Sequence, residues 1–288
     1  QQVWANGVLK STKVNTPASL GTSPIALTLG KGGATGTCPA SGNGYTPGIY
    51  DDVRIYNRAL SASEIQALYR EQAATINSSK NGKMTNGLVA LLSFDGADIQ
   101  GSTAYDRSGN GNNGTLTSSP RPSIGKIGQA LSFDGAATYI AMSGNPASLQ
   151  LSQGTVSAWI KTSNAGTSYR GIVSKASAYG MYLMGNIFGV YDNGAPAFRS
   201  TGVNLADNKW HHVSFSFDSG VTNGTLLYID GVLVLTTTLT NTSQATNVQV
   251  SRGQGGASQI FNGAIDDVRI YNRILPVSEI KQLYNMGK

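Results

Sequence analysis

The segment from Asp106 to Gly114 concentrates oxygen-bearing side chains and glycines in nine residues. It holds one carboxylate, three Asn amides and three glycines. Calcium takes roughly six to eight oxygen ligands in proteins, and glycines let a loop turn tightly enough for its carbonyl groups to point inward. The pattern predicts a bound calcium ion with Asp106, Asn110 and Asn112 among its ligands. The alternative is a turn in which the Asx side chains satisfy only their own backbone.

Asp266 is the carboxylate best suited to join these ligands. With side chains alternating at a period of two, Asp266 shares a face with the apolar Val268 and is expected to point inward. A buried carboxylate is costly unless it is hydrogen-bonded or meets a cation. We therefore expect Asp266 at the calcium ion, with Asp95 as a weaker candidate. Asp267 is expected on the opposite face, as a solvated partner of Arg269.

Groups suited to catalysis are scarce. Glycoside hydrolases use two carboxylates roughly 5–10 Å apart. The three glutamates, Glu64, Glu71 and Glu279, lie outside the expected strands. The two histidines, His211 and His212, are adjacent, so alternation turns them to opposite faces, where they form neither a metal pair nor a triad. The chain is therefore not expected to be an enzyme.

Aromatic residues in the middle of the chain are candidates for ligand recognition. Aromatic faces stack on sugar rings while Asn, Asp and Arg side chains bind hydroxyl groups, which is the general plan of a shallow polar site. Many of these rings must belong to the core, as is expected for Trp159 and Trp210. The predicted ligand-binding residues are Tyr169, Tyr191 and Arg199.

The composition favours strands and tight turns. Only 12% of the residues are charged, 40% are hydrophobic, and 36 are glycine. The net charge of +6 comes from Lys and Arg residues that occur singly, so nucleic acid is not an expected partner. No stretch approaches the ~18 consecutive apolar residues of a membrane span, so membrane insertion is not expected.

Cysteine usage and the amino terminus bear on the compartment. Cys38 is the only cysteine, so no intrachain disulfide is expected. The residues that follow Gln1 lack the features of a signal peptide, which is typical of a mature or trimmed product. Together with the sparse charge, these features favour a secreted or cell-surface protein.

Short apolar alternations separated by turn sequences predict an all-β fold. Asp230-Gly231 between two apolar runs is typical of a hairpin, and Ser278–Tyr284 is the one expected helix of the second half. We expect a two-sheet antiparallel β-sandwich of the jelly-roll type with a short C-terminal helix. The expected strands are 89–94, 130–133, 139–142, 155–161, 171–174, 180–184, 187–191, 210–218, 225–229, 232–237 and 248–252.

An internal repeat divides the chain. The eight residues from Asp51 to Arg58 recur from Asp266 to Arg273, at a spacing of 215 residues. A period that long indicates two copies of a domain. We therefore expect residues 1–70 to be the C-terminal part of a first copy, 71–86 to be a linker, and 87–288 to be a complete second copy.

The partial first copy cannot bury a core by itself. Three explanations remain open. The chain is a piece of a longer tandem array, or the first copy packs on the complete domain, or a neighbouring chain supplies the missing strands.

The motifs of the second copy resemble the laminin G-like jelly-roll domain of the concanavalin A-like lectin/glucanase superfamily. The resemblance covers residues 87–285, and residues 3–69 are similar to the last third of the same domain. It is carried by Gly87–Asp95, Asp106–Thr115, Ala130–Gly135, Lys209–Val213 and Ile265–Arg273. The resemblance implies an accessory module of secreted or surface proteins, with carbohydrate or protein ligands and often a structural calcium ion.

These observations favour a non-enzymatic extracellular binding or adhesion module, stabilised by calcium, whose partner is a glycan or a surface protein. The alternative is a structural subunit of an extracellular filament or surface array, in which other copies of the chain are the partners. A glycoside hydrolase is the third and least favoured possibility.

Overall fold

The structure of the chain is a computed structural model that describes residues 84–142, 144–164 and 166–288, and in the first 83 residues 2–5, 8–12, 53, 55–56, 58–62 and 64–65. The chain divides into two compact units, Gln1–Asn77 and Ser78–Lys288. The division falls within residues 71–86, the expected linker, of which residues 71–83 lie outside the described part.

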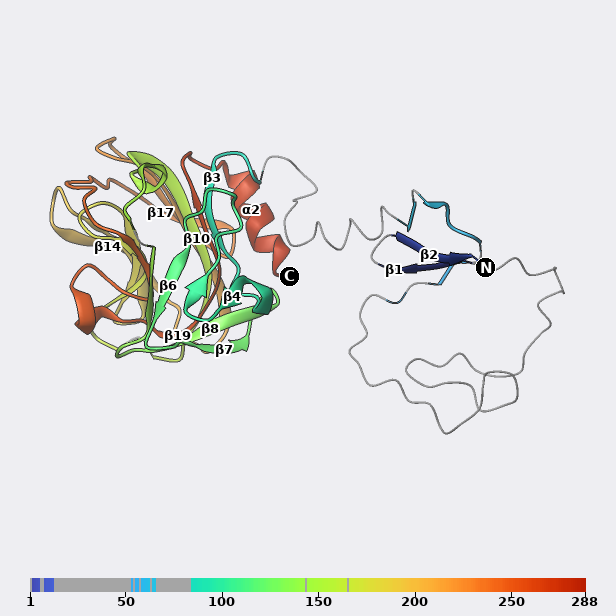
Figure 1. Cartoon of the computed structure of the whole chain (residues 1–288). Coiled ribbons are helices and arrows are strands. Elements are labelled where there is room, and N and C mark those ends of the chain that lie inside the picture. Colours follow the sequence, from blue (N-terminus) through green and yellow to red (C-terminus); the bar gives the residue numbers. More distant parts are fainter. Residues whose placement is uncertain are drawn as a thin grey trace. The chain divides into compact units, whose positions relative to one another are not determined.

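The second unit contains two large antiparallel sheets (Figure 1). The first sheet has the order β17-β16-β15-β10-β19-β8-β7, and β3 also pairs with β19. Its strands are β3 (Leu88–Leu92), β7 (Arg121–Ile124), β8 (Gln129–Asp134), β10 (Gln153–Lys161), β15 (Trp210–Asp218), β16 (Thr225–Ile229), β17 (Val232–Thr237) and β19 (Asn262–Tyr271).

The second sheet has the order β14-β13-β12-β11-β18-β9-β6-β5-β4. Its strands are β4 (Ile99–Gln100), β5 (Thr103–Ala104), β6 (Gly114–Thr117), β9 (Tyr139–Met142), β11 (Tyr169–Lys175), β12 (Gly180–Met184), β13 (Ile187–Asp192), β14 (Ala197–Asn204) and β18 (Val248–Val250). Three short 3₁₀ turns, η1 (Gly96–Asp98), η2 (Ala147–Leu149) and η3 (Gly256–Gln259), lie in the connections.

The core lies between the two sheets, because alternate residues of both turn apolar side chains toward each other. Every expected strand is present, with ends that agree within two residues. The β-sandwich prediction is therefore confirmed. Members of the core cluster from the first sheet include Val156, Ile160, Phe215 and Ile265, and those from the second include Ile140, Met181, Leu183 and Val190.

The outer face of the first sheet is partly covered by the C-terminal helix α2 (Val277–Met286), which confirms the expected helix. Ile280 and Leu283 of α2 form a second apolar cluster with residues of β3, β16 and β19. Trp159, on the outer face of β10, stacks on Tyr284 with ring centroids 5.7 Å apart. The uncovered part of this face is thus left for solvent or a ligand.

A bulge in β19 changes the face to which Asp266 belongs. The pairing of β10 with β19 shifts between Ser157 and Trp159, and Asp267 has a φ of 47°. Asp266 is consequently opposite Trp159 on the outer face, while Val268 points into the core. The expectation that these two residues share a face is wrong, because the bulge interrupts the alternation.

Asp267 does pair with Arg269, as expected, with 2.9 Å between Oδ2 and Nε. Both side chains are buried, however, with residue exposures of 7% and 8%. The expectation of a solvated pair is therefore wrong.

The described part of the first unit contains one hairpin, β1 (Gln2–Ala5) with β2 (Val8–Thr12). The repeated motif carries the same ion pair in both copies. Arg58 contacts Glu64 at 2.7 Å, and Arg273 contacts Glu279 at 2.6 Å. The sequence repeat thus extends to side-chain geometry. Most of the expected helix 61–69 lies outside the described residues.

Candidate functional site

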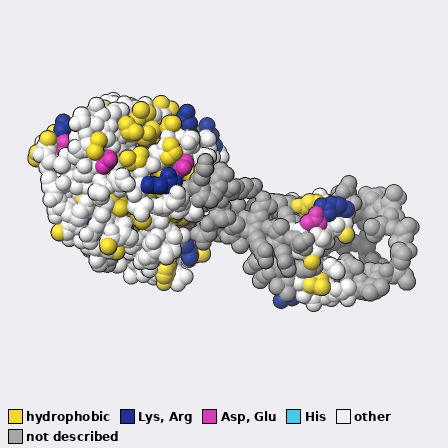
Figure 2. All heavy atoms as spheres, turned by 90° about the horizontal axis from the view of Figure 1, so that it is seen from above, with side chains coloured by type: hydrophobic (Ala, Val, Ile, Leu, Met, Phe, Trp, Pro, Cys, Tyr) yellow, Lys and Arg dark blue, Asp and Glu magenta, His cyan; other side chains and the backbone are white. Residues whose placement is uncertain are grey.

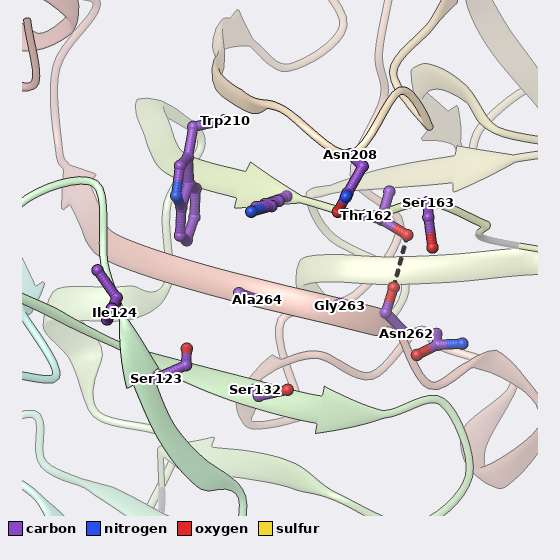
Figure 3. Close-up of a pocket in the computed structure, with 11 residues that line it drawn as sticks. Ser123, Ile124, Ser132, Thr162, Ser163, Asn208, Trp210, Asn262, Gly263 and Ala264 are labelled. Atoms are coloured by element: carbon purple, nitrogen blue, oxygen red, sulfur yellow. Dashed lines mark hydrogen bonds between the residues drawn. The ribbon is translucent and has the colours of Figure 1, made fainter.

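A cavity of about 370 Å³ opens on the uncovered part of the outer face of the first sheet. We call it the Trp210 groove. Strands β7, β8, β10, β15 and β19 and the turn before β15 contribute to it (Figure 3). It is lined by Ser123, Ile124, Ser132, Lys161, Thr162, Ser163, Asn208, Trp210, Asn262, Gly263 and Ala264.

Strand register brings these residues to one face. Ala264 of β19 lies opposite both Ser132 of β8 and Lys161 of β10, and Lys161 also lies opposite Trp210 of β15. Directly opposite residues in adjacent strands project from the same face. Segments that are far apart in the chain therefore meet in one groove.

The floor of the groove is made of small residues. Gly263 has a φ of 146°, and a Cβ atom on it would lie 2.3 Å from the carbonyl oxygen of Lys161. Only glycine fits at this position, since the conformation and the close backbone approach both exclude a side chain. Ala264 continues the floor, and the Thr162 hydroxyl fixes its edge by donating to the carbonyl oxygen of Asn262 at 2.6 Å.

The groove has an apolar end and a polar end (Figure 3). Trp210 and Ile124 lie at the first, and Ile124 is 90% exposed. Asn208, Ser163 and Asn262 lie at the second. Within the described part of the chain, the side chains of these three polar residues and of Lys161 make no hydrogen bond or ion pair with protein. Their hydrogen-bonding capacity is available to a ligand.

An ion-pair cluster holds the turn that carries Asn208. His211 lies between two carboxylates, with Nδ1 2.8 Å from Asp230 and Nε2 3.1 Å from Asp207. The hydrogen bond to Asp230 raises the pKa of His211, against the effect of partial burial. The protonated ring can donate to both carboxylates at once, which ties the turn before β15 to the β16–β17 hairpin.

Two of the three predicted ligand-binding residues meet in another cavity, of about 220 Å³, which we call the tyrosine pocket. Tyr169 and Tyr191 pack edge to face there, with ring centroids 5.8 Å apart. Arg199 does not line it, and its guanidinium instead donates to Asp192 at 2.8 Å. The remaining lining residues are Tyr182, Gln254, Gly255 and Gln259.

Three of the five predicted calcium ligands lie together beside β3. Each carboxylate oxygen of Asp106 accepts two hydrogen bonds, from the N–H groups of Leu91 and Ser108 and from the Ser108 hydroxyl and the Asn112 N–H. The amide nitrogens of Asn110 and Asn112 donate to carbonyl groups of β3. Four donors thus surround Asp106, as expected for a turn that satisfies its own backbone, and a calcium ion at this carboxylate would have to displace them.

The other two predicted ligands, Asp266 and Asp95, brace a different segment, 125–129. Asp266 accepts the N–H groups of Lys126 and Ile127 at 2.8 Å, and Asp95 accepts that of Gln129. Burial raises the pKa of Asp266 to about 7. In the described part of the chain, no three His, Cys, Asp or Glu side chains form a group that could hold a metal ion. Because amide and carbonyl ligands can also bind calcium, the calcium site stays a prediction.

The residues that sequence reasoning missed are those of the Trp210 groove. Trp210 was expected in the core, but it is half-buried and lines the groove. The alternation of β15 contains the missing signal, because Val213, Phe215 and Phe217 are core residues and Trp210 has the opposite phase. None of the lining residues is Asp, Glu or His, so the paired carboxylates of a glycoside hydrolase are not in this groove.

The described residues form no helix long and apolar enough to span a membrane. Figure 2 shows one face of the second unit, where charged side chains are few, hydrophobic side chains form one group, and most of the rest is other side chains and backbone.

A comparison with protein families finds a match to most of the chain. The family model of the Concanavalin A-like lectin/glucanases superfamily matches residues 1–66 and 134–281. A comparison with curated protein sequences finds no significant match.

Solved structures share the fold. Domain 4 of AbnA, a GH43 extracellular arabinanase from Geobacillus stearothermophilus in complex with arabinotriose, matches with a TM-score of 0.55 and 23% identity, over 68% of this chain and 98% of that domain. The binding domain of Paraclostridial Mosquitocidal Protein 1 matches with a TM-score of 0.55 and 16% identity, over 70% and 52%.

The binding domain of botulinum neurotoxin DC, in complex with rat synaptotagmin II, matches with a TM-score of 0.53 and 14% identity, over 71% of this chain and 52% of that one. The chain thus spans about half the length of the two toxin domains. The first of these neighbours was solved with arabinotriose and the other two are named binding domains, one of them solved with synaptotagmin II. Identities this low establish the shared fold alone.

Proposed function

Because the chain belongs to the concanavalin A-like lectin/glucanase superfamily, we propose that it is a non-enzymatic, extracellular glycan-binding module whose ligand lies in the Trp210 groove. The groove combines an indole ring, a floor of small residues and side chains free to bind hydroxyl groups. An aromatic face packs on the apolar face of a sugar ring, while amides and hydroxyls bind its edge.

The observation that carries the proposal is the unused hydrogen-bonding capacity beside Trp210. The side-chain amides of Asn208 and Asn262 are exposed, line the cavity and have no protein partner among the described residues, so a ligand can bind them without displacing a hydrogen bond to protein. A glycan supplies many hydroxyl groups that can donate and accept. A protein ligand would need a larger apolar contact than Trp210 and Ile124 provide.

The solved neighbours support a glycan ligand over a protein ligand. The arabinotriose-bound domain is matched over 98% of its length, whereas the synaptotagmin-bound domain is matched over 52%. The comparable unit is therefore a whole domain that is bound to a saccharide.

The test is a glycan-binding assay with the full chain and two matched variants. Trp210→Ala removes the indole of the groove, and Tyr169→Ala removes a ring of the tyrosine pocket. Plant and bacterial polysaccharides are screened by affinity electrophoresis, and thermal melting confirms that both variants fold. We expect Trp210→Ala to weaken binding roughly tenfold or more, as for a central aromatic anchor, and Tyr169→Ala to have little effect.

The opposite pattern would move the site to the tyrosine pocket, where Tyr169 and Tyr191 were predicted to bind the ligand. Unchanged binding in both variants, or no binding by the wild-type chain to any polysaccharide, would contradict the proposal.

A second candidate function is self-association, and the edge strand β17 favours it. β17 is the last strand of the first sheet, and Val232 and Leu233 are 61% and 46% exposed. An apolar strand at a sheet edge can pair with a strand of another chain. This arrangement suits a subunit of an extracellular filament.

A further inference from the structure

A row of five residues crosses the outer face of the first sheet from β7 to β15. The pairs that define the row are Arg121 with Ser132, Ser132 with Ala264, Ala264 with Lys161, and Lys161 with Trp210. All five side chains therefore project from the same face. Neighbouring strands are about 4.8 Å apart, so the row is roughly 19 Å long and its two cations are roughly 14 Å apart.

The row extends the Trp210 groove into a neighbouring cavity of about 490 Å³, which contains Arg121 and shares Ser132 with the groove. Within the described residues, neither Arg121 nor Lys161 has a carboxylate partner. The groove itself has no acidic lining residue. The positive charge along the row is therefore not neutralised by groove residues.

Asp134 is the one acid that lines the neighbouring cavity among the described residues. Its Oδ1 accepts the N–H groups of Ala136, Ala137 and Thr138 and the Thr138 hydroxyl. Despite some burial, these hydrogen bonds hold the pKa of Asp134 well below its usual range. The carboxylate is therefore ionised and bonded within its own turn, and among the described residues it makes no ion pair with Arg121.

A ligand that matches the row must present a flat ring face to Trp210, a hydroxyl group to Ser132 and an uncharged surface to Ala264. It must also bring negative charges to Lys161 and Arg121. We infer that the groove takes an acidic polysaccharide, whose sugar residues carry carboxylate or sulfate groups. This inference rests on the proposed glycan-binding function and specifies its ligand class.

Single-stranded nucleic acid also combines rings with negative charges, but it fits the row less well. Such binding generally uses several aromatic side chains on which successive bases stack. The row has a single aromatic residue, and small side chains lie between the cations. One ring face and two separated charges suit a saccharide chain better.

The test uses the full chain and five probes, measured by isothermal titration calorimetry at low and high NaCl concentration. Polygalacturonate and dextran sulfate supply the carboxylate and the sulfate. Carboxyl-reduced polygalacturonate supplies the neutral control, galacturonic acid monomer the short control, and single-stranded oligothymidine the nucleic acid control. The monomer is too short to reach both cations, so we expect it to bind more weakly than the polymer.

Three charge-removing variants accompany the wild type. Arg121→Gln and Lys161→Gln each remove one cation of the row. Lys281→Gln, on the exposed side of α2, makes the same change in net charge away from it. We expect each row variant to weaken binding of one acidic polymer about threefold to fivefold at low salt, the double variant to lose about the product of the two factors, and Lys281→Gln to match the wild type.

We also expect high salt to reduce the effect of the row variants, because salt screens exposed charges. Preference for polygalacturonate identifies carboxylate as the recognised group, and preference for dextran sulfate identifies sulfate. Neutral polymer binding as tightly as both acidic forms, row variants that match Lys281→Gln, or tighter binding of oligothymidine would each overturn the inference. If a neutral glycan still binds and Trp210→Ala abolishes that binding, the proposed function stands while the acidic class fails.

Discussion

His211 and His212 are adjacent in β15, but their surroundings shift their pKa values in opposite directions. His211 lies between Asp230 and Asp207, and its hydrogen bond to Asp230 raises its pKa. His212 is 2% exposed and packs against Trp159 with ring centroids 5.3 Å apart. Burial lowers the pKa of His212 to about 4. At a pH above about 4 and below the raised pKa of His211, the His211 ring is therefore protonated and the His212 ring is neutral.

A histidine titration followed by NMR can check both shifts, since the chain has only two histidines. We expect one ring to titrate above about pH 6.5 and the other near pH 4, where both would titrate near 6.5 if unperturbed. Loss of the higher titration in His211→Gln assigns it to His211. Two rings that titrate together near the unperturbed value would contradict the ion-pair cluster.

The stability supplied by His211 has a definite pH dependence. Because its folded pKa is raised, this contribution is complete below about pH 6.5, the unfolded value, and is lost as the pH rises through the folded pKa. The turn that carries Asn208 and leads to Trp210 is held less tightly above that window. We expect glycan affinity to fall over the same window in the wild type, and His211→Gln to have weaker, flatter binding. Affinity that is constant with pH in both proteins would contradict the link.

Asp106 is expected to stabilise the fold whether or not calcium binds. Its truncation leaves the N–H groups of Leu91, Ser108 and Asn112 without their acceptor. Each buried group left unsatisfied costs about 1–3 kcal/mol. We expect Asp106→Ala to lower the free energy of unfolding by about 2–4 kcal/mol in urea titrations with EDTA present. A loss below about 1 kcal/mol would show that the hydrogen bonds of this carboxylate do not brace the loop.

The calcium prediction is tested separately, by melting the wild-type chain with calcium and with EDTA. A ligand that binds only the folded state raises the melting temperature. If calcium binds the folded chain at the predicted ligands, we expect a higher melting temperature with calcium, and a smaller shift in Asn110→Ala. Identical melting curves in calcium and EDTA would contradict a bound calcium ion.

At the scale of elements, the floor of the Trp210 groove depends on the absence of a side chain in β19. A Cβ atom on Gly263 would lie 2.3 Å from a backbone oxygen, whereas one on Gly220 would have nothing within 4 Å. Both glycines have positive φ, at 146° and 81°. Gly220→Ala therefore reports the conformational cost alone, about 1–2 kcal/mol.

We expect Gly263→Ala to be more destabilising than Gly220→Ala by at least about 1 kcal/mol, because the backbone of β10 must also move. Urea unfolding of the two variants measures the difference. Equal losses of stability would show that the close approach of β10 and β19 has no energetic consequence.

The strands show how far local pattern determines the fold. Alternation and turn residues located every expected strand of the second unit, since each buries one apolar face. They missed β4, β5, β6 and β7, which are only two to four residues long, and β14, where Ala197–Asn204 has mostly exposed or half-buried residues and little apolar alternation. They also missed the bulge at Asp267, because the pairing that creates it involves β10, which lies far earlier in the chain.

The candidate site was harder to predict than the fold for a related reason. Tyr169 and Tyr191 were predicted to bind a ligand because aromatic residues between polar ones stand out locally; they do share a cavity, and their role in binding stays a prediction. The Trp210 groove is assembled from five strands by register, and its floor consists of Ser, Ala and Gly, which carry no chemical signal of their own. Such a site can be recognised only when the pairing register of the strands is known.

At the scale of the whole molecule, the exposed edge of β17 bears on whether copies of the chain associate. Val232 is 61% exposed at this edge, and Val221, in the turn before β16, is 47% exposed. A charge on an edge strand opposes pairing with another strand, whereas the same charge in a turn does not. The two valines therefore provide a test position and a matched control.

If the edge mediates self-association, the full chain should form species larger than 30.0 kDa as its concentration rises. Val232→Lys should then restore the monomer, because the added charge would have to be buried between paired strands, and Val221→Lys should leave the association unchanged. Sedimentation velocity from micromolar to millimolar concentration makes the measurement. A wild-type monomer throughout that range would exclude the filament function for this chain, and association that persists in Val232→Lys would place the contact on another surface.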